Sequence, residues 1–205
     1  MKIYVMRHGE TAWNAEGKIQ GRADIPLNEK GRELARKTSE ALKDIPFTRV
    51  YTSPLIRAKE TAMIVKGDRQ IPVIEDERIQ EISFGICEGC HCSPELFDAP
   101  DPNFRDFFLR PESYIPPEGG ESIEEMTERT SAFFNELIHD KTLEKETILV
   151  SSHGAALRGI LATVYQHDKA DFWAGGVYKN CAVTIVEVEN GIPKMLEEAK
   201  VYYTI

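Results

Sequence analysis

The sequence of 205 residues lacks any apolar run close to the roughly 20 residues that a membrane-spanning helix needs. It opens on a short apolar segment that predicts a strand, without the basic and then apolar profile of a secretory signal peptide. Internal repeats and low-complexity segments are also missing. These absences favour a single globular domain over residues 1–205 with no membrane partner, and we expect it in the cytoplasm.

Basic residues are the minority. Lysine and arginine number 25 against 34 aspartate and glutamate residues, so the formal net charge is -9. A protein that binds nucleic acid generally needs a basic face to neutralise phosphates, and we therefore expect no nucleic-acid partner. An anionic ligand of this protein must be bound by a local cluster of basic side chains.

Cysteine is scarce, with four residues that we expect to be reduced thiols in the cytoplasm. Cys87, Cys90 and Cys92 surround His91, a spacing that is shared with covalent haem attachment and with zinc sites. Haem attachment of this kind requires export, and a structural zinc site usually has a second, distant pair of ligands. We therefore expect no metal and no cofactor, with a metal-binding module as an alternative.

Apolar segments alternate along the chain with helical patterns, which is the βαβ signature. The predicted strands cover residues 3–6, 49–52, 72–75, 147–150, 182–188 and 194–202. The Asn190-Gly191 turn joins the last two as an antiparallel hairpin. We expect an α/β fold: a three-layer α/β/α sandwich with a mostly parallel central sheet, one antiparallel edge strand and a small inserted cap.

Capping residues predict where three of the helices begin. Asn28 is a predicted N-cap for a helix over residues 29–43, and Ser53 followed by Pro54 is typical of a second helix start. Ser122 and Glu125 form a capping box before a third helix.

Two segments have no clear periodicity. Residues 12–26 are expected to form a loop at the end of the first strand. Residues 93–117 are rich in proline and aromatic side chains, which must be buried although the prolines prevent one long helix. We interpret residues 93–117 as the cap or lid.

Two predicted strands run into a histidine followed by a glycine. Arg7 and His8 follow the first strand, His153 follows the fourth, and Arg57 lies near the start of the helix after another strand. If these strand ends are neighbours, the fold combines two imidazoles with two guanidinium groups. Guanidinium groups match phosphate oxygens, and a correctly held imidazole can attack phosphorus. The pattern predicts a phosphoryl-transfer site.

The motifs together resemble the histidine phosphatase superfamily, the family of cofactor-dependent phosphoglycerate mutases and their phosphatase relatives. The matching residues occur in order along almost the whole chain: Arg7-His8-Gly9-Glu10-Thr11, Asn14, Gly21, Asp24, Leu27, Gly31, Ser53-Pro54-Leu55, Arg57-Ala58, Thr61-Ala62, Glu81, Phe84-Gly85, Glu88-Gly89, Gly119-Gly120-Glu121-Ser122 and Ser152-His153-Gly154. Only residues 93–114 lie outside the resemblance.

The resemblance implies roles for eight residues. His8 would be the nucleophile that becomes a phosphohistidine, and Glu81 would be the general acid that later activates water. Acidic neighbours make Glu81 the least distinct of these assignments. The remaining residues would hold phosphoryl oxygens or substrate: Arg7, Arg57 and His153, then Asn14, Gln20 and Gly21. The guanidinium groups and the second imidazole would supply the positive charge, so no metal is required.

Mutases of this family have a longer insertion with paired arginines that bind a substrate carboxylate. Residues 93–117 are shorter and contain only Arg105 and Arg110, which are separated. We therefore expect hydrolysis of a small phosphorylated substrate, with an apolar or ring-bearing group favoured by the aromatic cap. A phosphoglycerate mutase and a non-catalytic phosphate-binding module are the alternatives. The sequence leaves the physiological substrate and the oligomeric state open.

Overall fold

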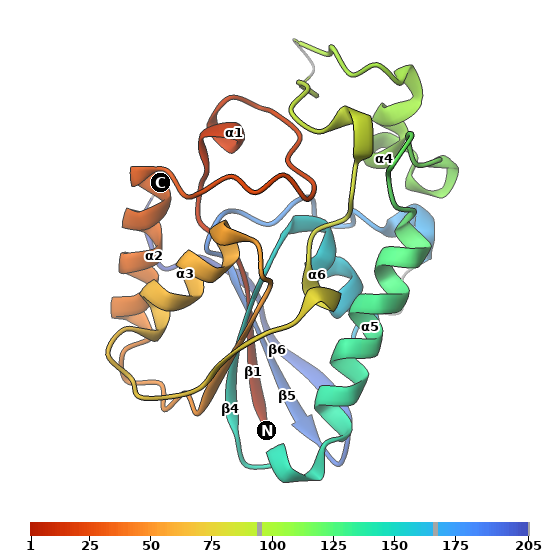
Figure 1. Cartoon of the computed structure of the whole chain (residues 1–205). Helices are drawn as coiled ribbons and strands as arrows, with labels where there is room; N and C mark the ends of the chain where they lie inside the picture. Colours follow the sequence, from red (N-terminus) through yellow and green to blue (C-terminus); the bar gives the residue numbers. More distant parts are fainter. Residues whose placement is uncertain (94–95, 166–167, 205) are drawn as a thin grey trace.

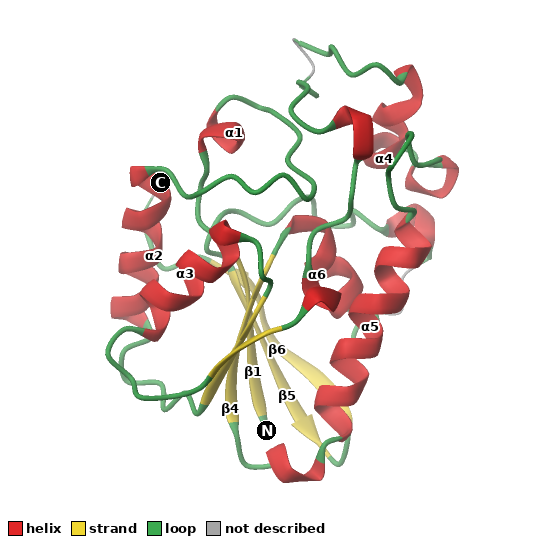
Figure 2. Cartoon of the chain, in the orientation of Figure 1, coloured by secondary structure: helices red, strands yellow, loops and turns green. Residues whose placement is uncertain are grey.

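The computed structural model describes residues 1–93, 96–165 and 168–204, and its centre is one six-stranded sheet (Figures 1 and 2). The order across the sheet is β3-β2-β4-β1-β5-β6. The strands are β1 (Lys2–Arg7), β2 (Arg49–Thr52), β3 (Val73–Glu75), β4 (Thr147–Ser152), β5 (Val183–Glu189) and β6 (Ile192–Lys200). Strands β1 to β4 are parallel, whereas β5 runs antiparallel to both β1 and β6.

Helices cover both faces of the sheet, with α2 (Glu29–Ala41) and α3 (Ile56–Lys66) on one side and α5 (Ile123–His139) and α6 (Gly154–Ile160) on the other (Figure 1). Successive residues of β1 point to opposite faces, as a strand requires. Ile3 and Val5 pack with residues of α5 and α6, whereas Tyr4 and Met6 pack with residues of α3. The expected fold class, a mostly parallel three-layer sandwich closed by an antiparallel hairpin, is confirmed.

Two predicted helix starts are confirmed. The Asn28 side chain accepts a hydrogen bond from Gly31 N at 2.7 Å, and α2 begins at the next residue. Ser122 and Glu125 form the expected capping box of α5. Capping is a local interaction, which is why these positions can be read from sequence.

The predicted start at Ser53 and Pro54 is wrong by two residues. Helix α3 begins at Ile56, and its N-cap position, Leu55, has no side-chain cap. Ser53 is fully buried, and its hydroxyl contacts His153 Nε2 at 2.7 Å as well as Leu55 N at 3.3 Å. The Ser53 hydroxyl therefore contacts the distant His153 and lies in a turn before α3, instead of capping the helix.

The expected loop over residues 12–26 contains a short helix, α1 (Ala12–Ala15). Thr11 and Asn14 cap it reciprocally, with Asn14 N donating to Thr11 Oγ1 at 3.1 Å. Four residues are too few for a detectable helical periodicity, so the sequence pattern could not predict it.

The described part of residues 93–117 forms three short helical pieces: Pro102–Arg105, α4 (Asp106–Leu109) and Pro111–Ser113. Two of them begin with proline, where the missing N–H has no cost. Phe104, Phe107 and Tyr114 are buried against one another and against Phe84. In Figure 1, α4 and α1 lie at the end of the sheet where the parallel strands finish. Residues 94 and 95 lie outside the described chain, and a lid function remains a prediction.

None of the helices within the described ranges combines the length and the apolar character needed to cross a membrane.

Candidate active site

The two histidines that follow predicted strands lie side by side. Strands β1 and β4 pair in parallel with Arg7 opposite Ser152, so the two strands end at the same edge of the sheet. His8 N donates to Ser152 O at 3.0 Å, and the ring centroids of His8 and His153 lie 5.2 Å apart. Both side chains are buried. The expected meeting of the two strand ends is confirmed.

Backbone contacts determine the tautomer of His8. Its Nδ1 lies 2.6 Å from Gly9 O, and because a carbonyl can only accept, Nδ1 carries the hydrogen. Burial, together with the charges of Arg57 and Arg7, holds the pKa of His8 well below its ordinary value. The imidazole is therefore neutral, and its lone pair is on Nε2. This is the form that a nucleophilic histidine needs.

His153 is held through both ring nitrogens. Arg57 Nε donates to its Nδ1 at 3.2 Å, so Nε2 carries the hydrogen and donates to Ser53 Oγ at 2.7 Å. Burial and then Arg57 and His8 lower its pKa well below the ordinary value. The neutral ring is thus oriented by Ser53, which directly follows β2, and by Arg57 of α3.

Arg57 is fully buried, and it links His153 to the loop after α1. Its Nη1 donates to Ala23 O at 2.7 Å and its Nη2 to Gly21 O at 2.6 Å. Burial lowers the pKa of Arg57 to about 10, so the guanidinium remains charged at neutral pH. The charge is therefore fixed beside His153, and the same side chain anchors the segment that carries Gln20 and Gly21.

Arg7 offers an unsatisfied donor. Its Nη1 donates to Tyr178 O, while its buried Nε has no hydrogen-bond partner among the described residues. Burial lowers the pKa of Arg7, and the nearby Glu81 opposes this effect. A buried cationic N–H without a partner is costly, so this position favours an anionic acceptor from outside the protein.

Glu81 lies at the N-terminus of α6. Its Oε1 accepts from Ala156 N at 2.9 Å and Ile82 N at 3.1 Å, and its Oε2 accepts from Ala155 N at 3.2 Å. A Cβ atom on Gly154 would lie 3.7 Å from Glu81 Oε2 and 3.8 Å from Arg7 Nε. The glycine therefore faces the space in which the carboxylate and the guanidinium meet.

A cavity of about 160 Å³ occupies this space. Its polar lining includes five of the residues expected from sequence: Arg7, Asn14, Gln20, Gly21 and Glu81. Its apolar wall includes Ile19, Phe84, Phe107, Phe108, Trp173 and Val177. The other three expected residues, His8, Arg57 and His153, are buried next to Arg7 and are not part of the lining. The cavity thus has a polar end, formed by residues expected from sequence, and an aromatic wall.

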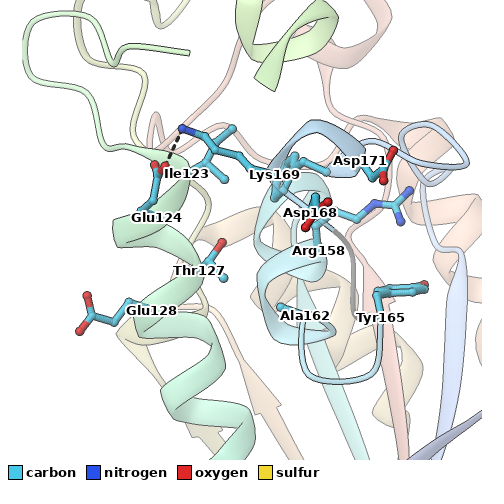
Figure 3. Close-up of a pocket in the computed structure, with 11 residues that line it drawn as sticks. Ile123, Glu124, Thr127, Glu128, Arg158, Ala162, Tyr165, Asp168, Lys169 and Asp171 are labelled. Carbon is cyan, nitrogen blue, oxygen red and sulfur yellow. Dashed lines mark ion pairs between the residues drawn. The ribbon is translucent and has the colours of Figure 1, made fainter. Parts of the chain in front are cut away.

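A larger cavity of about 450 Å³ lies between α5 and the chain after α6, where Lys169 and Glu124 form an ion pair (Figure 3). Among the described residues, it is lined by Arg158, Tyr165 and several carboxylates but by no histidine or cysteine. Although it is larger, it does not hold the groups that phosphoryl transfer requires.

Several residues of the site escaped the sequence interpretation. Ser53 was predicted as a helix cap and was part of the family resemblance, but no role at His153 was predicted for it. No site role was predicted for Thr61 or Asn180: Thr61 Oγ1 accepts from Gly9 N at 2.9 Å, and Asn180 Nδ2 donates to His8 O at 3.0 Å. Trp173 comes from a segment without periodicity and donates through Nε1 to Phe107 O at 2.6 Å. The family-like motif around Ser53 and Thr61 was the available signal, and Trp173 had none.

The cysteines are free, with Cys87 buried and Cys90 and Cys92 partly buried. The His91 side chain contacts Asp98, with His91 Nδ1 2.9 Å from Asp98 Oδ2. Across the described ranges, no group of three or more histidine, cysteine, aspartate and glutamate residues is arranged to hold a metal ion. The expected independence from metal stays a prediction.

Fold and site together have the features of a phosphate-processing α/β enzyme, and comparison with known proteins identifies the family. The sequence profile of the histidine phosphatase superfamily (branch 1) matches residues 3–199. This chain therefore belongs to the histidine phosphatase superfamily.

Relatives carry both phosphatase and mutase names. An uncharacterized phosphatase PhoE of Bacillus subtilis is 32% identical over 162 residues, which cover 79% of this chain and 76% of the relative. A probable phosphoglycerate mutase GpmB of Shigella boydii is 30% identical and covers 94% of this chain and 87% of its own length.

Solved structures agree over nearly the whole chain. YhfR of Bacillus stearothermophilus has a TM-score of 0.89 and 34% identity, with 98% of this chain and 97% of that chain covered. A phosphoserine phosphatase variant of Entamoeba histolytica, in complex with phosphoserine, has a TM-score of 0.79 and 32% identity, with 97% and 96% covered.

Proposed function

We propose that the protein is a phosphomonoester hydrolase that acts on a small phosphorylated metabolite through a covalent phosphohistidine at His8. In the first step, His8 Nε2 attacks phosphorus, the ester P–O bond breaks, and Glu81 gives its proton to the leaving oxygen. In the second step, Glu81 takes a proton from water, the water oxygen attacks phosphorus, and the P–N bond breaks. Inorganic phosphate leaves, and His8 and Glu81 return to their starting states.

The observation that carries this proposal is the neutral imidazole of His8, whose Nδ1–H is held by Gly9 O at 2.6 Å beside two guanidinium groups. Arg7, Arg57 and His153 would stabilise the charge on the phosphoryl oxygens, and Arg7 Nε, which has no partner among the described residues, would donate to one of them. Because these groups supply the positive charge, the proposed mechanism uses no metal.

The remaining expected residues would contact the substrate. Asn14 would bind the transferring phosphate, while Gln20 and Gly21 would line the passage beside the nucleophile. The Thr11 hydroxyl lies 2.9 Å from Gln20 Oε1, which orients the amide toward the cavity. The aromatic wall favours an apolar or ring-bearing group on the substrate.

Hydrolysis is favoured over phosphoglycerate mutation by the arginines of residues 93–117. Arg105 lies over the ring of Phe97, 4.3 Å from its centroid, and Arg110 binds Asp106 at 2.9 Å. Neither lines the cavity. A mutase would need such cations for the substrate carboxylate. Lys18 does line the cavity, but it is paired with Glu16 at 2.6 Å, so the site suits a mutase poorly.

The test compares His8→Ala with His139→Ala, a control at a histidine on the exposed end of α5. The first variant should lower turnover of p-nitrophenyl phosphate by at least on the order of 10³-fold, as expected for loss of a nucleophile, and the control should not. Wild-type protein quenched during turnover should carry acid-labile phosphate on histidine. Turnover retained in His8→Ala would overturn the mechanism, and a wild-type protein that binds phosphate without turnover would be a binding module.

A second assay separates hydrolase from mutase. The wild-type protein is incubated with 3-phosphoglycerate, with and without 2,3-bisphosphoglycerate, as part of a panel of phosphorylated metabolites. Release of inorganic phosphate from the panel supports the hydrolase. Rapid interconversion of the phosphoglycerates would establish the mutase instead. A cytoplasmic location and the absence of a nucleic-acid partner remain predictions from the sequence.

A further inference from the structure

Arg129, on α5, makes an unusually complete set of contacts with the backbone that carries Glu81. Its Nη1 donates to Arg78 O at 2.7 Å and to Gln80 O at 2.8 Å, and its Nη2 donates to Glu81 O at 3.0 Å. The side chain is 18% exposed. One guanidinium therefore binds three carbonyl groups within four residues.

Glu121 holds the guanidinium in place. Its Oε1 accepts from Arg129 Nε at 2.6 Å and its Oε2 accepts from Arg129 Nη2 at 2.8 Å, a two-point contact that leaves little rotational freedom. Arg22 extends the network, because its Nη2 donates to Glu121 Oε2 at 3.1 Å and its Nε to Glu81 O at 3.3 Å. The backbone carbonyl of Glu81 thus receives two guanidinium donors.

The segment from Gln80 to Phe84 belongs to no helix or strand element, so its carbonyl groups lack the partners that regular structure provides. At its other end the Glu81 side chain is held by the N–H groups of Ala155 and Ala156. Helix α6, which supplies them, packs on α5, with Ser131 Oγ donating to Gly159 O at 3.0 Å. Helix α5 therefore supports both ends of this residue.

We propose that Arg129 is a positioning residue for the carboxyl group of Glu81, with Glu121 fixing the guanidinium. This inference rests on the proposed role of Glu81 as the general acid. Arg129 does not line the cavity and would act through the backbone alone. Without it, the carbonyl groups of Arg78 and Gln80 lose this donor, that of Glu81 keeps only Arg22, and the carboxyl group shifts relative to the leaving oxygen. A displacement of about 1 Å at a catalytic group can cost roughly 10²-fold in rate.

A general acid matters most when the leaving group is a poor one, and this gives a selective readout. Glycerol phosphate has an alkoxide leaving group that needs a proton, whereas the nitrophenolate of p-nitrophenyl phosphate leaves without one. Displacement of Glu81 should therefore lower kcat/KM, which reports phosphoryl transfer to His8 and not the later hydrolysis step that both substrates share, far more for the first substrate than for the second. A general loss of folding or of phosphate binding would slow both equally.

The experiment uses Arg129→Lys, which keeps the positive charge but removes the planar fork. Its matched control is Arg69→Lys, because the Arg69 guanidinium likewise donates only to backbone carbonyl groups. These are Val65 O, Lys66 O, Leu42 O, Lys43 O and Ile45 O, at the far ends of α2 and α3. For Arg129→Lys, kcat/KM with glycerol phosphate should fall by roughly 10- to 100-fold, with less than about a threefold fall in kcat/KM with p-nitrophenyl phosphate. The control should leave the ratio of the two rates unchanged.

Equal losses on both substrates, or no loss on glycerol phosphate, would refute the positioning role. If Arg129→Lys fails to fold by circular dichroism, Glu121→Gln, which weakens the same contact, should give the same selective loss, and equal losses there would refute the idea as well. The variant Glu81→Gln separates the two levels of inference. If it shows no selective loss, the proposed acid is wrong; if it does and Arg129→Lys does not, only the positioning role fails.

A double variant adds a stricter condition. In the Glu81→Gln background, Arg129→Lys should cause no further selective loss on glycerol phosphate, because both changes remove the same step. Additive losses would mean that Arg129 acts on a different group.

Discussion

Acidification should destabilise this protein between pH 7.5 and 5.5 because His8 and His153 are buried in neutral form. In the folded protein the pKa of each lies well below the ordinary value of 6.5, chiefly through burial and then through nearby arginine charge. In the unfolded chain each histidine returns to that ordinary value. Below pH 6.5 the unfolded state therefore binds protons that the folded state does not, and stability falls as the pH falls.

The size of the effect follows from the linkage. One histidine that is neutral when folded contributes a loss of about 1.4 kcal/mol between pH 7.5 and 5.5, and the two together contribute about 2.7 kcal/mol. That is a large part of a typical domain stability of about 5–15 kcal/mol. Carboxyl groups with lowered pKa, such as Glu10 and Glu125, titrate below their ordinary value of 4.5 and so lie outside this range.

The assay is urea unfolding at pH 5.5, 6.5 and 7.5. In His8→Gln, where one of the two groups is gone, the loss between the extreme values should shrink from about 2.7 to about 1.4 kcal/mol. The corresponding change at His139, on the exposed end of α5, should leave the pH dependence near that of the wild type. A wild-type stability that is flat or rises toward pH 5.5, or an unchanged slope in His8→Gln, would refute the reasoning.

Two further predictions concern residues that support the site. Ser53→Ala should lower the free energy of unfolding by about 1–3 kcal/mol and reduce kcat, because it leaves the buried Nε2–H of His153 without its 2.7 Å acceptor; an unchanged urea midpoint would contradict this. Gly31→Ala should destabilise the protein by about 1–3 kcal/mol, because the added Cβ would lie 2.1 Å from Glu10 O and force α2 away from the loop that follows His8. Thermal denaturation checks it, and a melting temperature equal to that of the wild type would show that the contact relaxes without cost.

The polar side chains at the start of α2 and α5 illustrate what local sequence can predict. A cap depends on contacts within three or four residues, as with Asn28 and Gly31 or Ser122 and Glu125. The buried strands could also be predicted from sequence, because β1 and β4 are covered on both faces and their apolar runs are therefore continuous. Because His8 and His153 each follow such an apolar run, the sequence predicted that the two histidines lie close together at the end of the sheet.

The sequence by itself therefore determined the sheet sandwich, the family and the two strand ends at which the histidines meet, because each of these depends on short-range pattern or ordered motifs. Only the tertiary structure decided that Ser53 accepts a hydrogen bond from His153, 100 positions away, instead of capping α3. It also brought Trp173 to the aromatic wall and Arg129 to the backbone of Glu81. Such contacts join segments that are distant along the chain, and a long-range contact leaves no periodicity in the residues that make it.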